Sequence, residues 1–287
     1  MTEYLILGCG YTGRRVAERL LSTGAHLTAT TRDPNRLGDL SARGCEVLQL
    51  DMLDPRSLKD VVSRAARGCS VLLSVPPIKS PRGLVDPTPK IVAALGNQPR
   101  RVVYLSTTGV YGNTKLVDET TLIAPATQRQ RLRVAAEQAV TGGSWTSMIL
   151  RPAAIYGPGR GVHTSMQQGR FRLAGDGANF VSRIQVDDLA RLAVAALQSS
   201  VTGAYPVADD EPCTSREIVE FCGELLGLPL PGSVMRSEVN ETRRSDRRVN
   251  GSAARRLLDV GLRYPSYRTG IPAALQAEAE AASTQAT

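Results

Sequence analysis

A glycine triplet near the start of the chain restricts its fold more than any other feature. The motif GCGYTG has the spacing GxGxxG, and it lies between an apolar run over 4–8 and a helical pattern over 13–24. Gly8 permits a tight turn, Gly10 lets the backbone approach a pyrophosphate, and Gly13 lets the helix pack closely on the strand. The amino end of that helix then faces the phosphates. In this context the motif predicts a dinucleotide-binding loop formed by Gly8, Gly10, Tyr11, Thr12 and Gly13.

Apolar runs alternate with helical patterns through the first half of the chain. The runs predicted as strands are 4–8, 26–32, 46–51, 70–75, 101–107 and 147–153. The helical patterns between them are 13–24, 54–68, 88–97 and 128–142. Because these strands are apolar throughout, we expect them to be buried on both faces. The fold class predicted is α/β, a Rossmann-type doubly wound parallel sheet with a smaller C-terminal substrate lobe.

The composition of the sequence changes after Pro152: glycine and arginine become frequent, and the hydrophobic periodicity weakens. A later helix over 186–200 is expected to be capped by Asp187 or Asp188. The predicted division is a dinucleotide-binding domain over 1–159 with the helix 186–200, a substrate lobe over 160–185 and 203–272, and a flexible tail over 273–287. Residues 235–250 are charged and predicted to be a loop.

Composition and charge narrow the classes of partner. The net charge of +8 indicates either a solvated basic surface or attraction of an anionic ligand. Nucleic-acid binding is not predicted, because basic and aromatic residues are not interleaved. No apolar run approaches the ~20 residues that span a bilayer, and the chain begins with a strand rather than a signal peptide. Five scattered cysteines without metal spacing predict a reduced, cytoplasmic protein with no metal site.

The end of the second strand predicts NADP as the cofactor, with NAD as the alternative. NAD enzymes place an acidic residue here, whereas this strand ends in Thr30 and Thr31. Arg32 follows directly, and Arg36 comes one helical turn later. Hydroxyl and guanidinium groups suit a 2′-phosphate, which a carboxylate would repel. Asp33 comes one position too late and is expected to cap the next helix.

Further cofactor contacts are expected where other strands end, since ligands of doubly wound sheets bind at that edge. Asp51 and Met52 follow the third strand, where the adenine would lie. Val75 and Pro76 follow the fourth strand, near the pyrophosphate and the nicotinamide ribose. Pro152 at the end of the sixth strand completes the predicted set.

Four segments resemble the extended and atypical short-chain dehydrogenase/reductases, the NAD(P)-dependent epimerase/dehydratase group. They are VVYLSTTGVYG (102–112), LRPAAIYGPGR (150–160), SRIQVDDLARLAVAAL (182–197) and YPVADDEPCTSREI (205–218). The resemblance implies a Ser/Thr hydroxyl that binds the substrate oxygen, a tyrosine acid/base and a lysine that holds the nicotinamide ribose. It also implies a homodimer that pairs through helices near the fourth and fifth strands.

The sequence departs from that pattern at the tyrosine and lysine. The resemblance places Thr107 at the Ser/Thr position, and it places Arg129 and Arg133 where tyrosine and lysine are usual. Arginine stays protonated, so Arg129 cannot be an ordinary proton donor. Arg133 could still hold a ribose hydroxyl. Tyr111 and Tyr156 are the candidate substitute acids.

Two arginine groups lie in the C-terminal half; if several converge on the cleft they would bind an anionic substrate, and otherwise they form a solvated basic surface. They are Arg160, Arg170, Arg172 and Arg183, and Arg243, Arg244, Arg247 and Arg248. Arg183 and Arg248 are the residues that we expect in the cleft. Two functions follow from the sequence. The first is an NADP-dependent oxidoreductase or epimerase/dehydratase-like enzyme acting on a small polar or anionic molecule. The alternative is a non-catalytic NADP(H)-binding sensor.

Overall fold

A seven-stranded parallel sheet forms the centre of the computed structural model, which describes residues 3–81, 83–239 and 241–285. Its strands are β1 (Glu3–Leu7), β2 (His26–Thr31), β3 (Glu46–Gln49), β4 (Ser70–Leu73), β7 (Arg101–Leu105), β9 (Thr146–Pro152) and β14 (Gly203–Val207). Their order is β14-β9-β7-β4-β1-β2-β3, and every neighbouring pair is parallel. The order reverses between β1 and β4, as in the predicted Rossmann-type sheet, so that fold class is confirmed.

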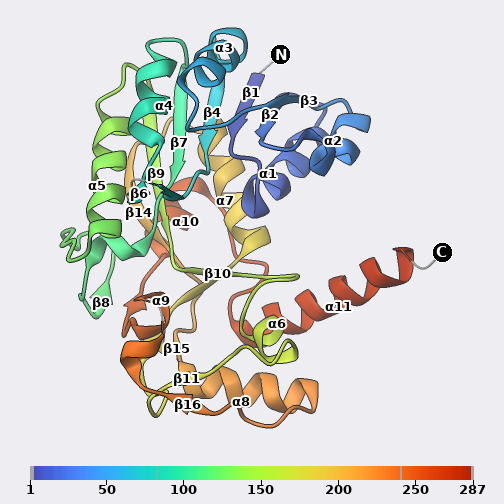
Figure 1. Cartoon of the computed structure of the whole chain (residues 1–287), viewed down its shortest axis with the longest axis vertical. Helices are drawn as coiled ribbons and strands as arrows, with labels where there is room; N and C mark the ends of the chain where they lie inside the picture. Colours follow the sequence, from blue (N-terminus) through green and yellow to red (C-terminus); the bar gives the residue numbers. More distant parts are fainter. Residues whose placement is uncertain (1–2, 82, 240, 286–287) are drawn as a thin grey trace.

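Helices cover both faces of the sheet, as Figure 1 shows. The helices on one face are α1 (Tyr11–Ser22), α7 (Val186–Gln198) and α10 (Ser252–Leu258), and those on the other are α3 (Pro55–Ala65), α4 (Thr88–Leu95) and α5 (Gln128–Thr141). The alternation of side chains in β1 explains the two cores. Tyr4 and Ile6 pack with the first group, whereas Leu5 and Leu7 pack with the second. An apolar strand can bury all of its residues only when helices lie on both sides.

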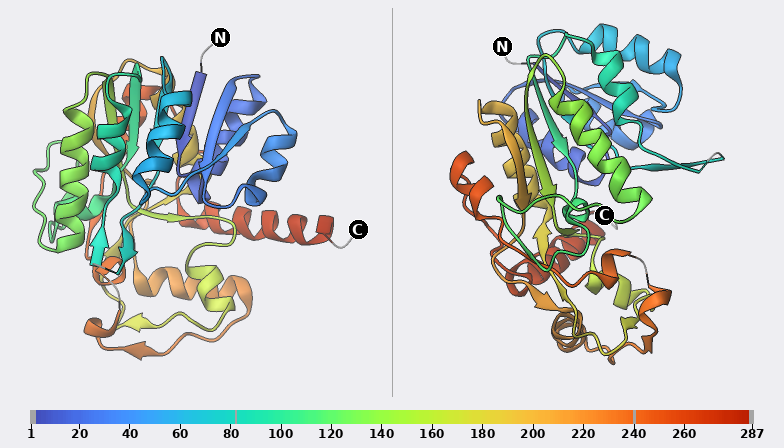
Figure 2. Two further views of the ribbon diagram at one scale, coloured as in Figure 1. Left: turned by 45° about the horizontal axis from the view of Figure 1, so that its top comes forward. Right: turned by 90° about the vertical axis from the view of Figure 1, so that its left-hand side faces the viewer.

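A smaller lobe lies beyond the carboxyl edge of the sheet, at the bottom of Figure 1 and in both views of Figure 2. Its strands form short pairs: β10 (Ala154–Tyr156) with β13 (Arg183–Gln185), β11 (Leu173–Ala174) with β16 (Ser233–Val234), and β12 (Phe180–Val181) with β15 (Cys213–Thr214). Its helices are α6 (Val162–Gln167), α8 (Ser215–Leu226), α9 (Glu241–Arg244) and α11 (Tyr267–Gln285). A separate apolar core, which includes Met166, Ile218 and Ile271, holds the lobe together.

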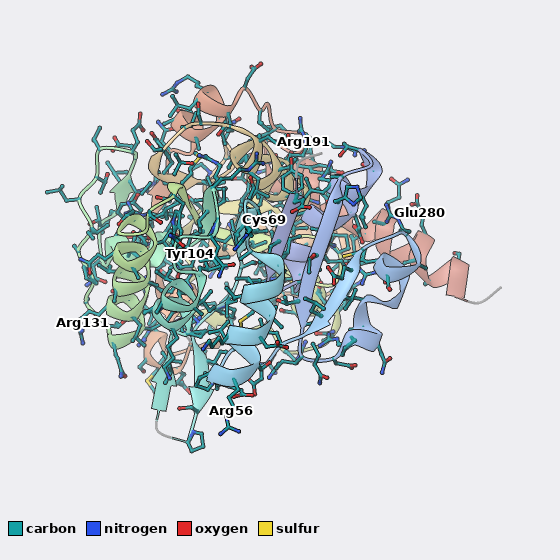
Figure 3. The ribbon with its side chains drawn as sticks, turned by 90° about the horizontal axis from the view of Figure 1, so that it is seen from above. Arg56, Cys69, Tyr104, Arg131, Arg191 and Glu280 are labelled. Atoms are coloured by element: carbon teal, nitrogen blue, oxygen red, sulfur yellow. The ribbon has the colours of Figure 1, made fainter. Side chains whose placement is uncertain are left out.

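Shorter elements complete the chain. They are the 3₁₀ turns η1 (Pro34–Leu37), η2 (Thr108–Tyr111) and η3 (Arg236–Glu238), the helix α2 (Gly38–Ala42), the hairpin of β5 (Ile78–Ser80) and β6 (Gly83–Val85), and the pair of β8 (Leu116–Val117) with β17 (Arg248–Val249). Figure 3 contrasts Tyr104 and Cys69, which are buried between the layers, with Arg56 and Arg131, which are exposed on outer helix surfaces. Within the described residues, no helix is both long enough and apolar enough to cross a membrane.

The structure differs from the sequence predictions in the C-terminal third. Residues 203–207, expected in the smaller lobe, form β14 at the edge of the large sheet, because β14 pairs with β9 over its whole length. The tail, expected to be flexible, continues α11 to Gln285. The predicted loop 235–250 contains η3, α9 and β17, and its residue 240 lies outside the described residues.

Candidate cofactor and substrate site

The three glycines of the first loop have different structural requirements. Gly8 has a φ of +89°, and a Cβ added there would lie 2.8 Å from Val75 Cγ2. A Cβ on Gly13 would lie 2.9 Å from the Gly8 carbonyl oxygen. A Cβ on Gly10, in contrast, would meet no described atom within 4 Å. Folding therefore requires Gly8 and Gly13 to be glycine, whereas Gly10 leaves open space in front of α1.

The amino end of α1 is suited to bind an anion. Its N-cap residue is Gly10, no side chain in the described part of the structure caps it, and its first turn contains no acidic residue. The first amides of a helix lack intrahelical acceptors and carry a partial positive charge. Tyr11 and Thr12 lie in this first turn. Open space beside uncapped amides fits the pyrophosphate of a dinucleotide.

Thr30 fastens the glycine loop to the end of β2. Its hydroxyl accepts a hydrogen bond from the Gly8 amide at 3.1 Å and donates one to the Ile6 carbonyl, also at 3.1 Å. The Cys9 amide donates to the Thr30 carbonyl at 2.9 Å. Thr30 is fully buried, so of the two predicted hydroxyls only that of Thr31 lies near the surface.

Two cations lie at the adenosine end of the predicted site. The side chains of Arg32 and Arg36 are exposed, and neither has a hydrogen-bond or ion-pair partner among the described residues. Thr31 accepts a hydrogen bond from the Asp33 amide at 3.3 Å. Asp33 caps η1 by accepting from the Asn35 amide at 3.1 Å, as predicted. The exposed guanidinium groups are therefore available to a phosphate.

The other predicted cofactor residues follow neighbouring strands at the same edge. Asp51 is exposed, and its carboxylate accepts from the Leu53 amide at 2.9 Å. Met52 is buried. Val75 is buried against Gly8, Pro76 is exposed, and Pro152 is buried at the end of β9. The fold thus brings the ends of β1 to β4, β7 and β9 together along one edge.

Arg133 occupies the position expected for lysine, but its guanidinium is bound by the protein. Its Nη1 donates to the Val75 carbonyl at 3.0 Å and lies 3.3 Å from Asp86 Oδ2. Its Nη2 donates to the Leu105 carbonyl. Arg133 is 5% exposed. The side chain therefore joins the ends of β4 and β7.

The Tyr111 hydroxyl belongs to a buried polar network. It accepts a hydrogen bond from Arg151 Nη1 at 3.0 Å. Arg151 also pairs with Glu137 at 2.7 Å, and the Ser106 hydroxyl donates to the same carboxylate. Tyr111 is 0% exposed, and burial raises the pKa of its hydroxyl. The network therefore fixes the turn after β7, which carries Tyr111, to β9 and α5.

Thr107 and Tyr156 occupy different environments. Thr107 is half-buried at the start of η2, directly after β7, and its hydroxyl accepts from the Gly109 amide at 3.0 Å. Tyr156 is buried in the lobe, and its hydroxyl donates to the Ser266 carbonyl at 3.2 Å. Of the residues considered as catalytic, Thr107 has the more accessible hydroxyl. Arg129 is exposed on α5.

The loop after β10 contacts the glycine loop. The Tyr11 hydroxyl donates a hydrogen bond to the Pro158 carbonyl at 3.0 Å, and the guanidinium carbon of Arg160 lies 5.2 Å from the centre of the Tyr11 ring.

The N-cap of α7 is Gln185, and not Asp187 or Asp188 as predicted. Both carboxylates lie in the first turn instead, where they still complement the helix dipole.

The structure separates the arginines of the two predicted groups. Arg247 donates to the carbonyls of Thr108, Thr114 and Gly112 and so ties the lobe to the turn after β7. Arg248 packs over the Phe180 ring and lines a hollow beside Asp209, apart from the other arginines. A cavity in the lobe is lined by Arg172, Arg183 and Arg243. Arg170 and Arg244 are exposed. Of the two arginines expected in the cleft, Arg183 alone lines this cavity.

An uncapped helix after a glycine turn, at the reversal point of a parallel sheet, defines a dinucleotide-binding protein of the Rossmann type. The family model described as NAD(P)H-binding matches residues 8–200. The chain belongs to this NAD(P)H-binding family.

Comparison with individual proteins agrees with this assignment. A solved structure of a conserved protein of unknown function from Silicibacter pomeroyi is 33% identical, with a TM-score of 0.79 over 97% of this chain and 99% of that one. The UDP-glucuronic acid 4-epimerase from Bacillus cereus, solved with UDP-glucuronic acid and NAD, is 17% identical, with a TM-score of 0.79 over 98% and 100%. The predicted resemblance to the epimerase/dehydratase group is thus confirmed in the fold.

A curated relative is a reductase. The 3-diazoavenalumate denitrifying reductase of a Streptomyces species is 34% identical over 101 residues. The match spans 33% of this chain and only a third of that protein's own length.

Proposed function

We propose that this protein is an NADP(H)-dependent reductase acting on a small organic anion. The observation that carries the proposal is the uncapped amino end of α1, with open space at Gly10 and two exposed guanidinium groups, Arg32 and Arg36, at the adenosine side. The family match supports a nicotinamide dinucleotide, and the name of the Streptomyces relative supports reduction of an organic acid.

The choice of NADP rests on charge. No acidic side chain ends β2, and Asp33 is engaged as the cap of η1. Arg32 and Arg36 would bind the 2′-phosphate by charge-assisted hydrogen bonds. A reduced cytoplasmic setting belongs to the same proposal, since all five cysteines are unpaired and buried.

In this proposal the cofactor supplies a hydride when bound. Thr107 binds the reacting oxygen of the substrate, because its hydroxyl lies just beyond the end of β7. Arg133 and Tyr111 act as positioning residues, since their polar atoms are bound to Val75, Asp86 and Arg151. The proton comes from water, because Tyr111 and Tyr156, the two candidate acids, are both buried.

Titration of the purified protein with NADPH and NADH tests the cofactor assignment. We expect tighter binding of NADPH, and an Arg32→Ala variant that loses about tenfold or more in NADPH affinity with little change for NADH, as for one lost charge-assisted hydrogen bond. Arg131→Ala, on the exposed face of α5, is the matched control. Failure of both dinucleotides to bind would overturn the proposal.

One observation favours a non-catalytic NADP(H) sensor as the second candidate. Helix α5 contains no tyrosine, and Arg133 is occupied by protein groups. A sensor would bind NADPH tightly but would not oxidise it with any keto acid of a broad panel. Substrate-dependent loss of NADPH absorbance decides between the two candidates.

A further inference from the structure

The cavity in the lobe has an unusual combination of walls. Its volume is about 110 Å³. Most of its lining is apolar and includes Ile155, Val162, Phe171, Ile218 and Ile271. Three arginines complete the walls, and none of the described lining residues is acidic. Because Ala154 and Ile155 come two and three residues after the end of β9, the cavity begins near the carboxyl edge of the sheet.

Arg183 is a buried cation for which the described part of the chain offers no counter-ion. It is only 6% exposed, and its Nη1 donates to the Val181 carbonyl at 2.6 Å and to Cys213 Sγ at 3.0 Å. No carboxylate lies within ion-pair distance of it among the described residues. Burial of an unpaired charge is costly, so buried charges are normally paired. An anion bound from solution would supply the missing partner.

The acidic residue beside Arg183 does not fill that role. Asp209 follows β14, is 2% exposed, and donates its backbone amide to the Arg183 carbonyl at 2.7 Å. No described residue provides a hydrogen-bond partner for its carboxyl oxygens. Burial raises the pKa of this carboxyl to about 8, although Arg183 opposes the shift. The Asp209 carboxyl group forms neither a hydrogen bond nor an ion pair with Arg183 among the described residues, so the position of Asp209 does not supply the missing partner.

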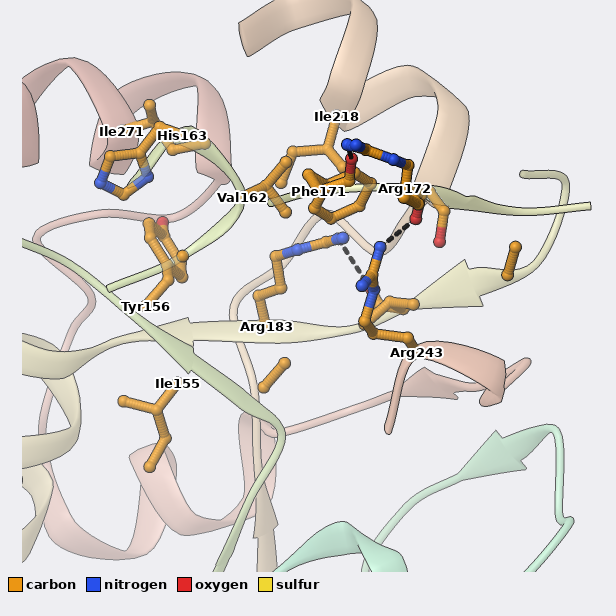
Figure 4. A pocket seen from close by; sticks show the side chains of 15 residues that line it. Ile155, Tyr156, Val162, His163, Phe171, Arg172, Arg183, Ile218, Arg243 and Ile271 are labelled. Carbon is orange, nitrogen blue, oxygen red and sulfur yellow. Dashed lines mark hydrogen bonds between the residues drawn. The ribbon is translucent and has the colours of Figure 1, made fainter. Parts of the chain in front are cut away.

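A second cation faces Arg183 across the cavity. Figure 4 shows the side chains of Arg183, from β13, and Arg243, from α9, pointing toward one another. The guanidinium carbon of Arg243 lies 4.1 Å from the centre of the Phe171 ring, and its Nη2 donates to the Arg172 carbonyl. Two guanidinium groups that converge in an apolar pocket repel one another unless an anion lies between them.

We propose that this cavity binds the carboxylate of a small organic acid between Arg183 and Arg243, with the apolar body of the acid against Ile155, Val162 and Phe171. The size favours a compact ligand, since a cavity of ~150 Å³ holds one benzene ring. The apolar walls favour a monoanion, because a dianion costs more to desolvate. That the acid is the substrate rests on the proposed function, but the binding itself does not.

Calorimetric titration of the full chain with NADP⁺ present tests the site. The probes are isobutyrate, the neutral isobutyramide of the same shape, and inorganic phosphate. We expect the acid to bind at least tenfold more tightly than the amide or phosphate. Equal binding of acid and amide would overturn the proposal, and tighter binding of phosphate would overturn the role of the apolar walls.

Variants locate the binding within the protein. Arg183→Gln and Arg243→Gln should each weaken isobutyrate binding at least tenfold, with partial recovery in Arg183→Lys. Arg236→Gln is the matched control, since Arg236 is exposed on η3 outside the cavity lining. Unchanged acid binding in Arg243→Gln contradicts the site even where Arg183→Gln does not fold. If the acid binds but NADPH does not, the proposed reductase function is overturned and the proposed carboxylate site stands. If NADPH binds but the acid does not, the carboxylate site is overturned and the reductase proposal stands.

Discussion

The amide of Gly8 donates a hydrogen bond to the hydroxyl of Thr30 across 3.1 Å, which joins the end of β1 to the end of β2. Because the same hydroxyl donates to the Ile6 carbonyl, Thr30 satisfies polar groups on both sides of the turn. The glycine loop is thereby fixed before any cofactor binds. A loop ordered in advance loses less conformational entropy when its ligand arrives.

This rigid loop predicts opposite effects for two similar substitutions. Gly10→Ala should leave the unfolding midpoint nearly unchanged, since its Cβ meets no described atom within 4 Å, but it should weaken NADPH binding by occupying the space before α1. Gly13→Ala should lower stability by about 1–3 kcal/mol, because its Cβ lies 2.9 Å from a backbone oxygen. Thermal unfolding and NADPH titration of both variants check this. If Gly13→Ala loses as much NADPH affinity as Gly10→Ala but keeps its stability, close packing at Gly13 is not the reason for the glycine.

The turn after β7 predicts distinct roles for Thr107 and Tyr111. Thr107→Val should lower kcat by about a hundredfold, the effect of losing one hydrogen bond to a reacting oxygen, with NADPH affinity retained. Thr107→Ser is the control that keeps the hydroxyl. Tyr111→Phe should keep kcat within a few-fold but cost about 1 kcal/mol of stability, because Arg151 loses an acceptor. A Tyr111→Phe variant that is stable but inactive would instead make Tyr111 the proton donor.

The buried pair of Glu137 and Arg151 predicts a large effect on stability. Glu137→Gln should lower the free energy of unfolding by about 3 kcal/mol, because it leaves the Arg151 guanidinium buried without a counter-charge. Urea denaturation measures this change. The control is Glu211→Gln, whose exposed pair with Arg268 should contribute less than about 1 kcal/mol. If the free energy of unfolding decreases by a similarly small amount in both variants, the buried pair of Glu137 and Arg151 contributes no more to stability than the exposed pair.

Asp209 predicts a pH dependence of stability. Its pKa is about 8 in the folded protein and near 4 when unfolded, so between these values the folded state holds the proton that the unfolded state has lost. Stability therefore falls as the pH rises through this range, by about 2 kcal/mol or more between pH 5 and pH 7 from this group. Asp209→Asn should flatten that decline. The check is urea denaturation of both proteins at pH 5 and pH 7. If the free energy of unfolding falls by the same amount between these pH values in the wild type and in Asp209→Asn, the raised pKa of Asp209 is excluded.

Local sequence patterns determined the cofactor half of the protein. The spacing of Gly8, Gly10 and Gly13 predicted the loop, and the apolar runs predicted the strands that form the sheet. The cap formed by Asp33 was also predictable. These features depend on residues close together in the chain, where backbone conformation and side-chain periodicity decide the outcome.

Tertiary structure decided the remainder, because partners distant in the chain compete for the same groups. Residues 203–207 join the sheet only because β9 offers them an unpaired edge. Arg133 could have faced a ribose, but the carbonyl ends of β4 and β7 lie within its reach. Arg183 lies in a cavity without acidic lining, whereas Arg248 stacks on Phe180 beside Asp209. Charge alone marked both arginines as candidates; only their burial and their neighbours in space distinguish them.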